Sequence, residues 1–324
     1  MEKLVSSIFK AYDIRGIVAT QLTPQTTELI GQVLGSMAIE NQVKGLVVGY
    51  DGRLTSPMLA KSLINGILST GCNVFEIGEV TTPMVYFANY ELKTYSGVMI
   101  TGSHNPPEYN GLKMVMAGDT LSGDKIQQIY QRIQDKQVIK GNGVHYCENI
   151  LEAYFTKITS DVKLARRMSI VVDAGNGVAG KIAPQLYRRL GCKVLGLFCE
   201  VDGNFPNHHP DPSKPENLND IIHALNTTET EIGLAFDGDG DRLGVVTKDG
   251  NIIYPDRQMM LYAADILSKN PQGKIIYDVK SSRLLADWIK ENQGIPIMCR
   301  TGHSFVKAKI KETGALLAGE MSGH

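Results

Sequence analysis

One pattern occurs three times along the chain and constrains its fold more than any other feature. Each copy starts with a short apolar run that ends in aspartate, continues through a loop and a helix-like run closed by glycine, and finishes with a second apolar run. The three aspartates are Asp51, Asp173 and Asp278. Apolar runs without alternation are typical of strands covered on both faces, and the helix between them makes each copy a βαβ unit.

Each unit also contains a later apolar run that leads into a loop rich in reactive side chains, at residues 102–106, 237–242 and 319–324. A further apolar run follows in the first two units only. We therefore predict successive similar α/β domains with mixed, mainly parallel sheets sandwiched by helices. Their expected bounds are 1–150, 151–252 and 253–324, the third being incomplete. Residues 202–215, rich in Pro, Asn, His and Asp, are predicted to form a long loop.

Composition excludes several classes of protein. The 33 Lys and Arg residues nearly cancel the 34 Asp and Glu residues, which argues against a nucleic-acid-binding surface. No apolar stretch approaches the ~20 residues of a membrane span, and residues 1–10 lack the apolar core of a secretory signal. The scattered cysteines are expected to be free core thiols in a reducing cytoplasm; they are Cys72, Cys147, Cys192, Cys199 and Cys299.

The loop Asp237-Gly238-Asp239-Gly240-Asp241 places three carboxylates within five residues. These groups repel one another unless a cation lies among them, and carboxylate oxygens suit Mg²⁺ or Ca²⁺. An EF-hand is excluded, because its sixth position would be Arg242 and its twelfth Lys248. The alternative is an acidic turn without metal.

Ser103 follows a buried apolar run among small residues, so we expect it to be exposed and approachable. It is not in a G-x-S-x-G elbow, and a neighbouring His104 does not by itself establish a catalytic base. An ordinary serine turn and a nucleophile both fit this loop alone. A nearby Mg²⁺ would favour a serine that carries a phosphoryl group, whose charge of about −2 the metal and basic side chains can balance.

A rival interpretation comes from residues 175–180, which match G-x-G-x-x-G and suggest a dinucleotide site. Asp173, just before these glycines, has the same position in its unit as Asp51 and Asp278 have in theirs. No such glycine pattern follows those two aspartates, so an architectural role for residues 175–180 is favoured. Basic groups beside the reactive loops would instead form a local anion site; they are Arg15, Lys113, Arg242, Lys280 and His303.

Four segments, taken in order, resemble the α-D-phosphohexomutase family, most closely its bacterial phosphomannomutase/phosphoglucomutase branch. They are residues 9–16, the serine loop 101–106, the acidic loop 237–242 and the loop 319–324. Gly102 stands where alanine is common in this branch, and Met321 resembles the hexose enzymes more than phosphoglucosamine mutases. The family's fourth domain, which grips the non-reacting phosphate, has no counterpart in the chain.

The resemblance implies a cytoplasmic, Mg²⁺-dependent enzyme that interconverts hexose 6-phosphates and hexose 1-phosphates of mannose or glucose, with glucose 1,6-bisphosphate as activator. Ser103 would carry the phosphoryl group and, with Asp237, Asp239 and Asp241, hold one Mg²⁺. Catalytic roles are implied for Arg15, His104, Lys113 (as general acid/base) and Arg242. Sugar phosphate would contact Tyr12, Lys280, His303, Glu320, Ser322 and His324.

Further expectations accompany this interpretation. The alternatives are a phosphoglucosamine mutase, or a truncated sugar-phosphate-binding fragment with little turnover. The chain alone is expected to be catalytically impaired, and its third unit to have an open sheet edge or an unanchored end. It is predicted to be a monomer or a homodimer, without nucleic-acid or membrane partners.

Overall fold

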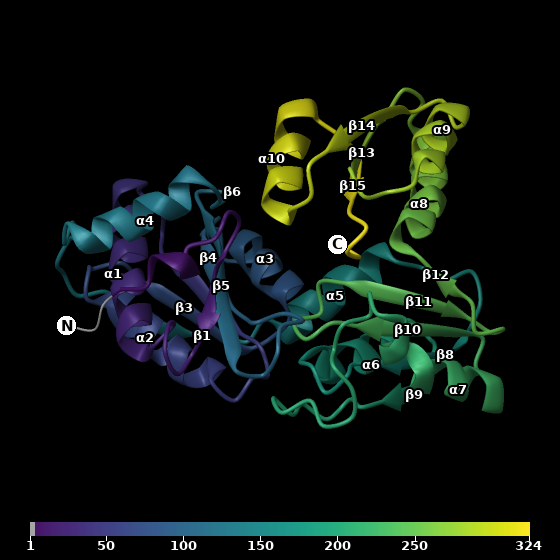
Figure 1. The fold of residues 1–324 in the computed structure, drawn as a ribbon, viewed down its shortest axis with the longest axis horizontal. Coiled ribbons are helices and arrows are strands. Elements are labelled where there is room, and N and C mark those ends of the chain that lie inside the picture. Colours follow the sequence, from purple (N-terminus) through teal and green to yellow (C-terminus); the bar gives the residue numbers. More distant parts are fainter. Residues whose placement is uncertain (1–3) are drawn as a thin grey trace.

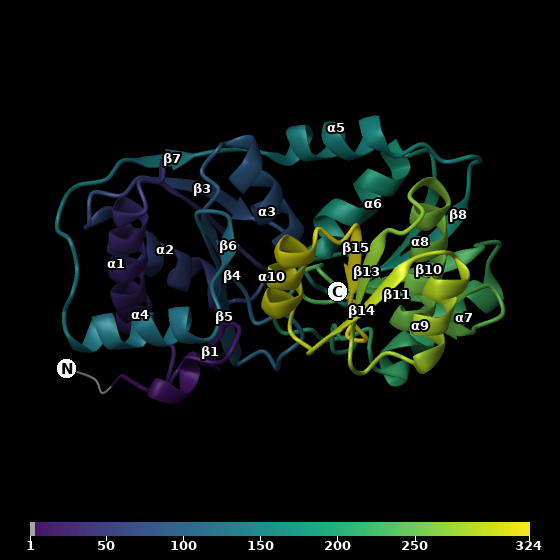
Figure 2. The ribbon, with the colours of Figure 1, turned by 90° about the horizontal axis from the view of Figure 1, so that it is seen from above.

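The computed structural model describes residues 4–324, and so does not cover the first three residues of the segment tested for a secretory signal. Figure 1 shows three α/β bodies: one from the N-terminal part of the chain, one from its middle, and a smaller C-terminal one that lies above the other two in this view. Figure 2 shows α10 (His303–Thr313) of the third body next to the first.

The first body contains a sheet in the order β1-β5-β4-β2-β3-β7, with β6 paired to β5. Strand bounds are β1 Ile14–Ile17, β2 Leu46–Tyr50, β3 Val74–Glu79, β4 Gly97–Ile100, β5 Tyr109–Met116, β6 Asp119–Thr120 and β7 His145–Cys147. The helices are α1 Pro24–Glu40, α2 Ser56–Leu68, α3 Thr82–Glu91 and α4 Asp124–Gln134, after a short 3₁₀ turn at Ser6–Ile8.

The second sheet has the order β12-β11-β10-β8-β9. Its strands are β8 Ser169–Asp173, β9 Lys193–Leu197, β10 Ile232–Phe236, β11 Leu243–Thr247 and β12 Ile252–Ile253. The helices are α5 Leu151–Asp161, α6 Ala179–Arg189 and α7 Asn219–Thr227, the last preceded by a 3₁₀ turn at Pro215–Leu218. Between β9 and that turn no helix or strand forms, as predicted for the long loop.

The third sheet has the order β14-β13-β15, so β15 forms one of its edges. Its elements are α8 Pro255–Lys269, β13 Lys274–Asp278, α9 Arg283–Glu291, β14 Ile295–Cys299, α10 His303–Thr313 and β15 Leu317–Gly319. Residues 252 and 253 pair with β11, so β12 straddles the predicted boundary between the second and third domains.

The three units share one topology. The strands that lead into the reactive loops are β4, β10 and β15, and each pairs in parallel with the central strand β2, β8 or β13. Asp51 directly follows β2, while Asp173 and Asp278 are the last residues of β8 and β13. On its other side, the central strand pairs in parallel with β3, β9 or β14. In the first two sheets β5 and β11 add antiparallel partners. The predicted fold class of mixed, mainly parallel α/β domains is therefore confirmed.

The core alternates across the central strand of the first sheet. Leu46 and Val48 of β2 pack into the cluster under α1 and α2, whereas Val47 faces the opposite cluster. This second cluster also contains Phe155 of α5 and Ile182 of α6. The first two bodies therefore share part of one hydrophobic core, which fixes their relative position.

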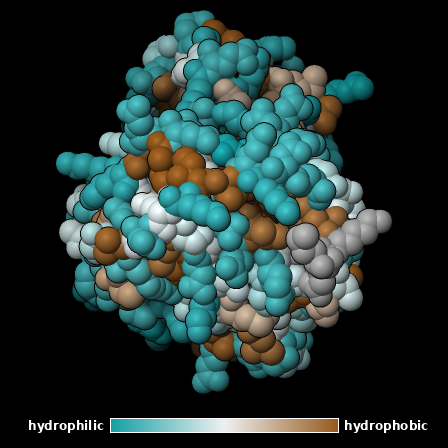
Figure 3. Space-filling model, turned by 90° about the vertical axis from the view of Figure 1, so that its left-hand side faces the viewer, coloured by the Kyte–Doolittle hydropathy of each residue, from teal (hydrophilic) through white to brown (hydrophobic). Residues whose placement is uncertain are grey.

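Within residues 4–324, no helix combines the length and apolarity needed to cross a membrane. Figure 3 shows one face of the molecule covered mostly by hydrophilic residues, with a narrow hydrophobic strip across it. The five cysteines are free, as predicted, but they are not all in the core. Cys147 is exposed because it lies on the edge strand β7, while Cys199 and Cys299 are half-buried.

Candidate active site

The three reactive loops meet around one cavity of about 630 Å³. The carboxyl ends of neighbouring parallel strands share one sheet edge, which explains why each loop lies at the end of its sheet that faces the others. The predicted residues that line this cavity are Tyr12, Arg15, Ser103, His104, Lys113, Arg242, Lys280, His303, Glu320, Ser322 and His324. Asp237 and Asp239 lie beneath it, fully buried.

Ser103 has a backbone φ of 49°, in the left-handed region that non-glycine residues rarely adopt. Its Oγ donates a hydrogen bond of 2.8 Å to Asp237 Oδ2 and lies 3.2 Å from His104 Nδ1. The expectation that this serine is exposed was wrong, since only 1% of its surface is accessible. The acidic loop of the second body covers it and leaves it at the cavity floor.

The serine loop is held in place by Arg53, a residue that sequence reasoning missed. Its guanidinium is buried and donates to three backbone carbonyls of the loop, those of Ser103 (2.7 Å), Asn105 (2.6 Å) and Pro106 (2.7 Å), and to that of Tyr109 (3.0 Å) at the start of β5. Arg53 Nε also lies 3.3 Å from Asp51 Oδ2. The signal available in the sequence was an arginine two residues beyond a strand-ending aspartate.

The three loop carboxylates point toward a common centre, with ligand oxygens all within 4.8 Å of one another. Burial and the charges of Asp239 and Asp241 raise the pKa of Asp237 to about 8. Asp239 Oδ1 is buried and, among residues 4–324, has no hydrogen-bond partner. An oxygen-only donor set with an orphaned buried carboxylate oxygen fits a hard cation such as Mg²⁺.

Lys113 brings a positive charge from the first body to this centre. Its Nζ lies 2.6 Å from Asp239 Oδ2 and 2.5 Å from Asp241 Oδ2. Burial alone would lower the pKa of Lys113, but the two aspartates outweigh it, and the pKa is raised. Thr82, which sequence reasoning missed although it follows a strand end, also donates to Asp239 Oδ2.

Two arginines surround the serine. Arg15 donates to Asn105 Oδ1 at 3.1 Å and to Asp13 Oδ2 at 2.5 Å, and Arg242 Nε lies 3.9 Å from Asp237 Oδ2. Burial and the charge of Arg242 lower the pKa of His104 to about 3, so this imidazole is neutral. The cavity floor is therefore suited to an anion.

The third body supplies the opposite wall. Glu320 is buried and accepts a hydrogen bond of 2.5 Å from the Gly302 amide. His324 lies between Ser322 Oγ, 3.1 Å from Nδ1, and Asp241 Oδ1, 3.2 Å from Nε2. Burial works to lower the pKa of His324, but Asp241 and Glu320 raise it to about 9. Burial and the charge of Lys113 lower the pKa of the neighbouring His303 to about 2.

The glycine-rich segment 175–180 has a structural explanation. An added Cβ at Gly180 would lie 2.2 Å from the carbonyl oxygen of Cys199, so a larger residue does not fit. The Val178 amide donates to the Gly238 carbonyl, and the Asn176 side chain donates to the Glu200 carbonyl. This loop supports the acidic loop, which favours the architectural interpretation over a dinucleotide site.

Three family descriptions match the chain in succession. They are the phosphoglucomutase/phosphomannomutase alpha/beta/alpha domain I over residues 6–139, domain II over 145–250 and domain III over 254–324.

Individual proteins give the same result. The chain is 55% identical to a phosphoglucomutase of Neisseria gonorrhoeae over 100% of its own length and 71% of that protein. It is 54% identical to a phosphomannomutase/phosphoglucomutase of Pseudomonas aeruginosa, covering 99% of the chain and 69% of that protein. A crystal structure of a family protein from Burkholderia thailandensis superposes with a TM-score of 0.96 at 50% identity, over 99% of this chain and 72% of that one. The chain therefore belongs to the phosphoglucomutase/phosphomannomutase family of α-D-phosphohexomutases.

Proposed function

We propose that this phosphohexomutase interconverts the 6-phosphates and 1-phosphates of glucose and mannose through a phosphoserine at Ser103 and a hexose 1,6-bisphosphate. The names of its relatives, phosphoglucomutase and phosphomannomutase/phosphoglucomutase, support these two substrates. The observation that carries the proposal is the position of Ser103 Oγ, which lies 2.8 Å from Asp237 at the floor of a cavity lined by cationic groups.

The phosphoryl group would pass from Ser103 to the free O6 or O1 of the sugar phosphate, so one O–P bond breaks as another forms. Arg15 and Arg242 would hold its oxygens and offset their charge, the main requirement of phosphoryl transfer. Mg²⁺ held by Asp237, Asp239, Asp241 and the serine phosphate would add positive charge at the same oxygens. The bisphosphate would then turn over and return its other phosphoryl group to Ser103.

Lys113 is proposed as the general acid/base. Its aspartate partners keep it protonated, which is the form needed to donate a proton to the oxygen that loses phosphate. To accept the proton of an attacking hydroxyl in the other half-reaction, the amine must first be released from at least one of these carboxylates.

Sugar recognition is proposed for the third body. Glu320 can accept hydrogen bonds from sugar hydroxyls, and Ser322 can both donate and accept. Tyr12, Lys280, His303 and His324 line the same cavity and are proposed to contact the sugar or its second phosphate. One set of such groups can hold a hexose in two orientations, which the two half-reactions require.

The test is to incubate the purified chain with glucose 1,6-bisphosphate and Mg²⁺ and to measure its intact mass. We expect one added phosphoryl group, mapped to Ser103 by peptide mass spectrometry. Ser103→Ala should remove the label and lower kcat/KM for glucose 1-phosphate and mannose 1-phosphate by at least about 10³-fold, because it removes the group that accepts the phosphoryl.

Ser160→Ala is the matched control, since this exposed serine lies on α5 and, within residues 4–324, its hydroxyl bonds to Lys157 and Asp161 of the same helix. It should keep both label and activity. Chelation of Mg²⁺ should stop turnover without removing phosphate already on Ser103. A chain that turns over substrate while Ser103 is never labelled, or that labels equally as Ser103→Ala, would disprove the phosphoserine route.

A further inference from the structure

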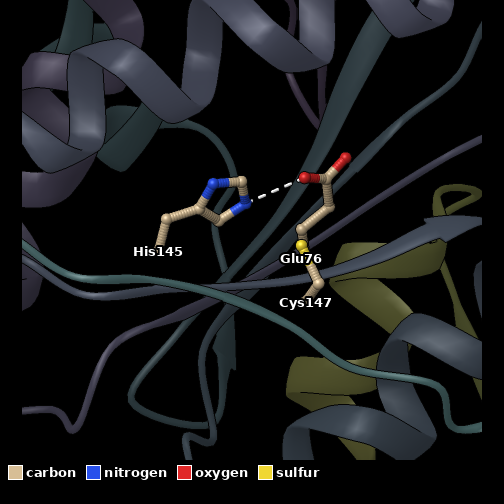
Figure 4. A group of neighbouring side chains, drawn as sticks. All are labelled: Glu76, His145 and Cys147. Atoms are coloured by element: carbon tan, nitrogen blue, oxygen red, sulfur yellow. Dashed lines mark hydrogen bonds and ion pairs between the residues drawn. The ribbon is translucent and has the colours of Figure 1, made fainter.

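A second group of metal-ligating side chains lies at the far edge of the first sheet. The edge strand β7 pairs in parallel with β3, which places Cys147 directly opposite Glu76, while His145 lies two residues earlier on the same face. Ligand atoms of Glu76, His145 and Cys147 all lie within 4.8 Å of one another. Figure 4 shows the His145 ring facing the Glu76 carboxylate, with the Cys147 sulfur close to Glu76.

The three side chains are accessible but already partly organised. His145 Nε2 lies 2.8 Å from Glu76 Oε2, and their side chains are 37% and 25% exposed. Cys147 is a free, exposed thiol. Glu76 and Cys147 also line a cavity of about 610 Å³ between β3 and the second body, together with Glu79 and Glu148. Carboxylates therefore outnumber the one lysine of this cavity, Lys181, which pairs with Glu79.

The geometry points to a zinc-binding site formed by Glu76, His145 and Cys147, with water from the cavity as fourth ligand. One nitrogen, one sulfur and one carboxylate oxygen are the donors that Zn²⁺ prefers, whereas Mg²⁺ and Ca²⁺ prefer oxygen alone. A neutral imidazole, a thiolate and a carboxylate carry two negative charges, which match the ion. On binding, the thiol gives up its proton to solvent.

The spacing needs little adjustment. Ligands at about 2.0–2.3 Å from Zn²⁺ in a tetrahedron lie roughly 3.5 Å from each other. The ligand atoms already lie within 4.8 Å of one another, so a movement of about 1 Å by side chains that are at least partly exposed would bring them to this separation. The ion would fasten β7 to β3 just before the chain passes into α5 and the second body.

The two candidate sites differ in donor softness, which makes them separable by experiment. The acidic loop 237–241 contains no sulfur, so a signal from thiolate ligation can come only from a cysteine. The reduced chain is therefore titrated with Co²⁺, a spectroscopic substitute for Zn²⁺, in excess Mg²⁺, which competes with Co²⁺ for sites made of oxygen alone. We expect one thiolate-to-cobalt charge-transfer band per chain, abolished by equimolar Zn²⁺.

Cys147→Ser should abolish the band, and His145→Gln and Glu76→Gln should each weaken Co²⁺ binding by at least about 10-fold. The matched controls are Cys299→Ser, on β14 of the third body, and His223→Gln, an exposed histidine of α7; both should leave the band unchanged. Absence of the band, or its persistence in Cys147→Ser, would overturn the site and leave only the hydrogen bond between Glu76 and His145.

A second measurement needs no variant. Zn²⁺ in excess Mg²⁺ should slow alkylation of Cys147 by iodoacetamide at least 10-fold, as followed by peptide mass spectrometry, while the rate at Cys299 stays the same. Equal rates at Cys147 with and without Zn²⁺ would also overturn the proposal. Neither measurement uses mutase activity, so the outcome is independent of the proposed function.

Discussion

Ser103 combines two properties that are costly for a serine, a left-handed backbone and near-complete burial. Such conformations cost on the order of 1–3 kcal/mol and persist only where the surroundings impose them. Here Arg53 holds the serine in this conformation, because its guanidinium binds the carbonyls on both sides of His104. The reactive serine is therefore aimed by an arginine that lies 50 residues earlier in the sequence.

Arg53→Met should destabilise the protein by about 3–5 kcal/mol, because it leaves the buried Asp51 carboxylate and several loop carbonyls without their cationic partner. Urea unfolding measures the loss. Arg132→Met removes an exposed ion pair with Glu40 and should cost less than about 1 kcal/mol. Equal losses in the two variants would mean that Arg53 does not hold the loop.

At the scale of elements, the aspartate that ends the central strand of each unit has the same task. Asp51 accepts hydrogen bonds from Thr101 and Gly102 in the serine loop. Asp278 accepts from the Met321 amide in the loop of the third unit. In the second unit Asp173 accepts from Gly175 and from His208 of the long loop. Buried carboxylates thus tie each strand end to a neighbouring loop.

The His208–Asp173 pair predicts a pH-dependent stability. Burial works to lower the pKa of His208, but the hydrogen bond and charge of Asp173 raise it above 6.5. Because the pKa of His208 is higher in the folded state, the pair contributes its full stabilisation of that state below about pH 6.5. This stabilisation is lost as the pH rises through the folded-state pKa. Urea unfolding from pH 5 to 9 should show this loss in the native chain.

His208→Gln should flatten that part of the profile, because glutamine does not titrate. The exposed His223→Gln provides the comparison and should keep the native profile. An unchanged slope in His208→Gln would show that other groups cause the pH dependence.

The sequence predicted the strands and their reactive loops because buried apolar runs and strand-end polar residues leave a local trace. The only local sign of Arg53 was its position two residues after Asp51, which does not reveal its role, since its partners are backbone carbonyls distant along the chain. The burial of Ser103 depends on a loop of another domain, and the exposure of Cys147 depends on β7 being an edge strand. Both are properties of tertiary arrangement, which spacing along one unit does not encode.

At the scale of the whole molecule, the backbone of the second body comes into direct contact with the backbone of the first. A Cβ added at Gly238 would lie 2.4 Å from the carbonyl oxygen of Ser103, so the acidic loop touches the serine loop only because glycine stands there. The shared core around Phe155 and Ile182 keeps the two bodies in this relation. Precise positioning of the serine against the acidic loop thus depends on the interface as well as on each loop.

Gly238→Ala should separate the two loops and lower kcat/KM for glucose 1-phosphate by about 10²-fold or more, the effect expected of a displacement near 1 Å at reacting groups. Gly196→Ala, on the edge strand β9, brings an added Cβ near only the Cys199 side chain and should leave kcat/KM unchanged. Similar kinetics for Gly238→Ala and the native chain would contradict the close approach.

Asp241 is the point where all three bodies meet, since it belongs to the second, while Lys113 comes from the first and His324 from the third. Its carboxylate therefore connects the first and third bodies to the second. A cation that binds the acidic loop must compete with both of these partners for the same carboxylate. Metal occupancy and the freedom of the outer bodies to rotate are therefore expected to be linked, and linkage is reciprocal. Closing the cavity around a sugar phosphate should then change how tightly the metal is held.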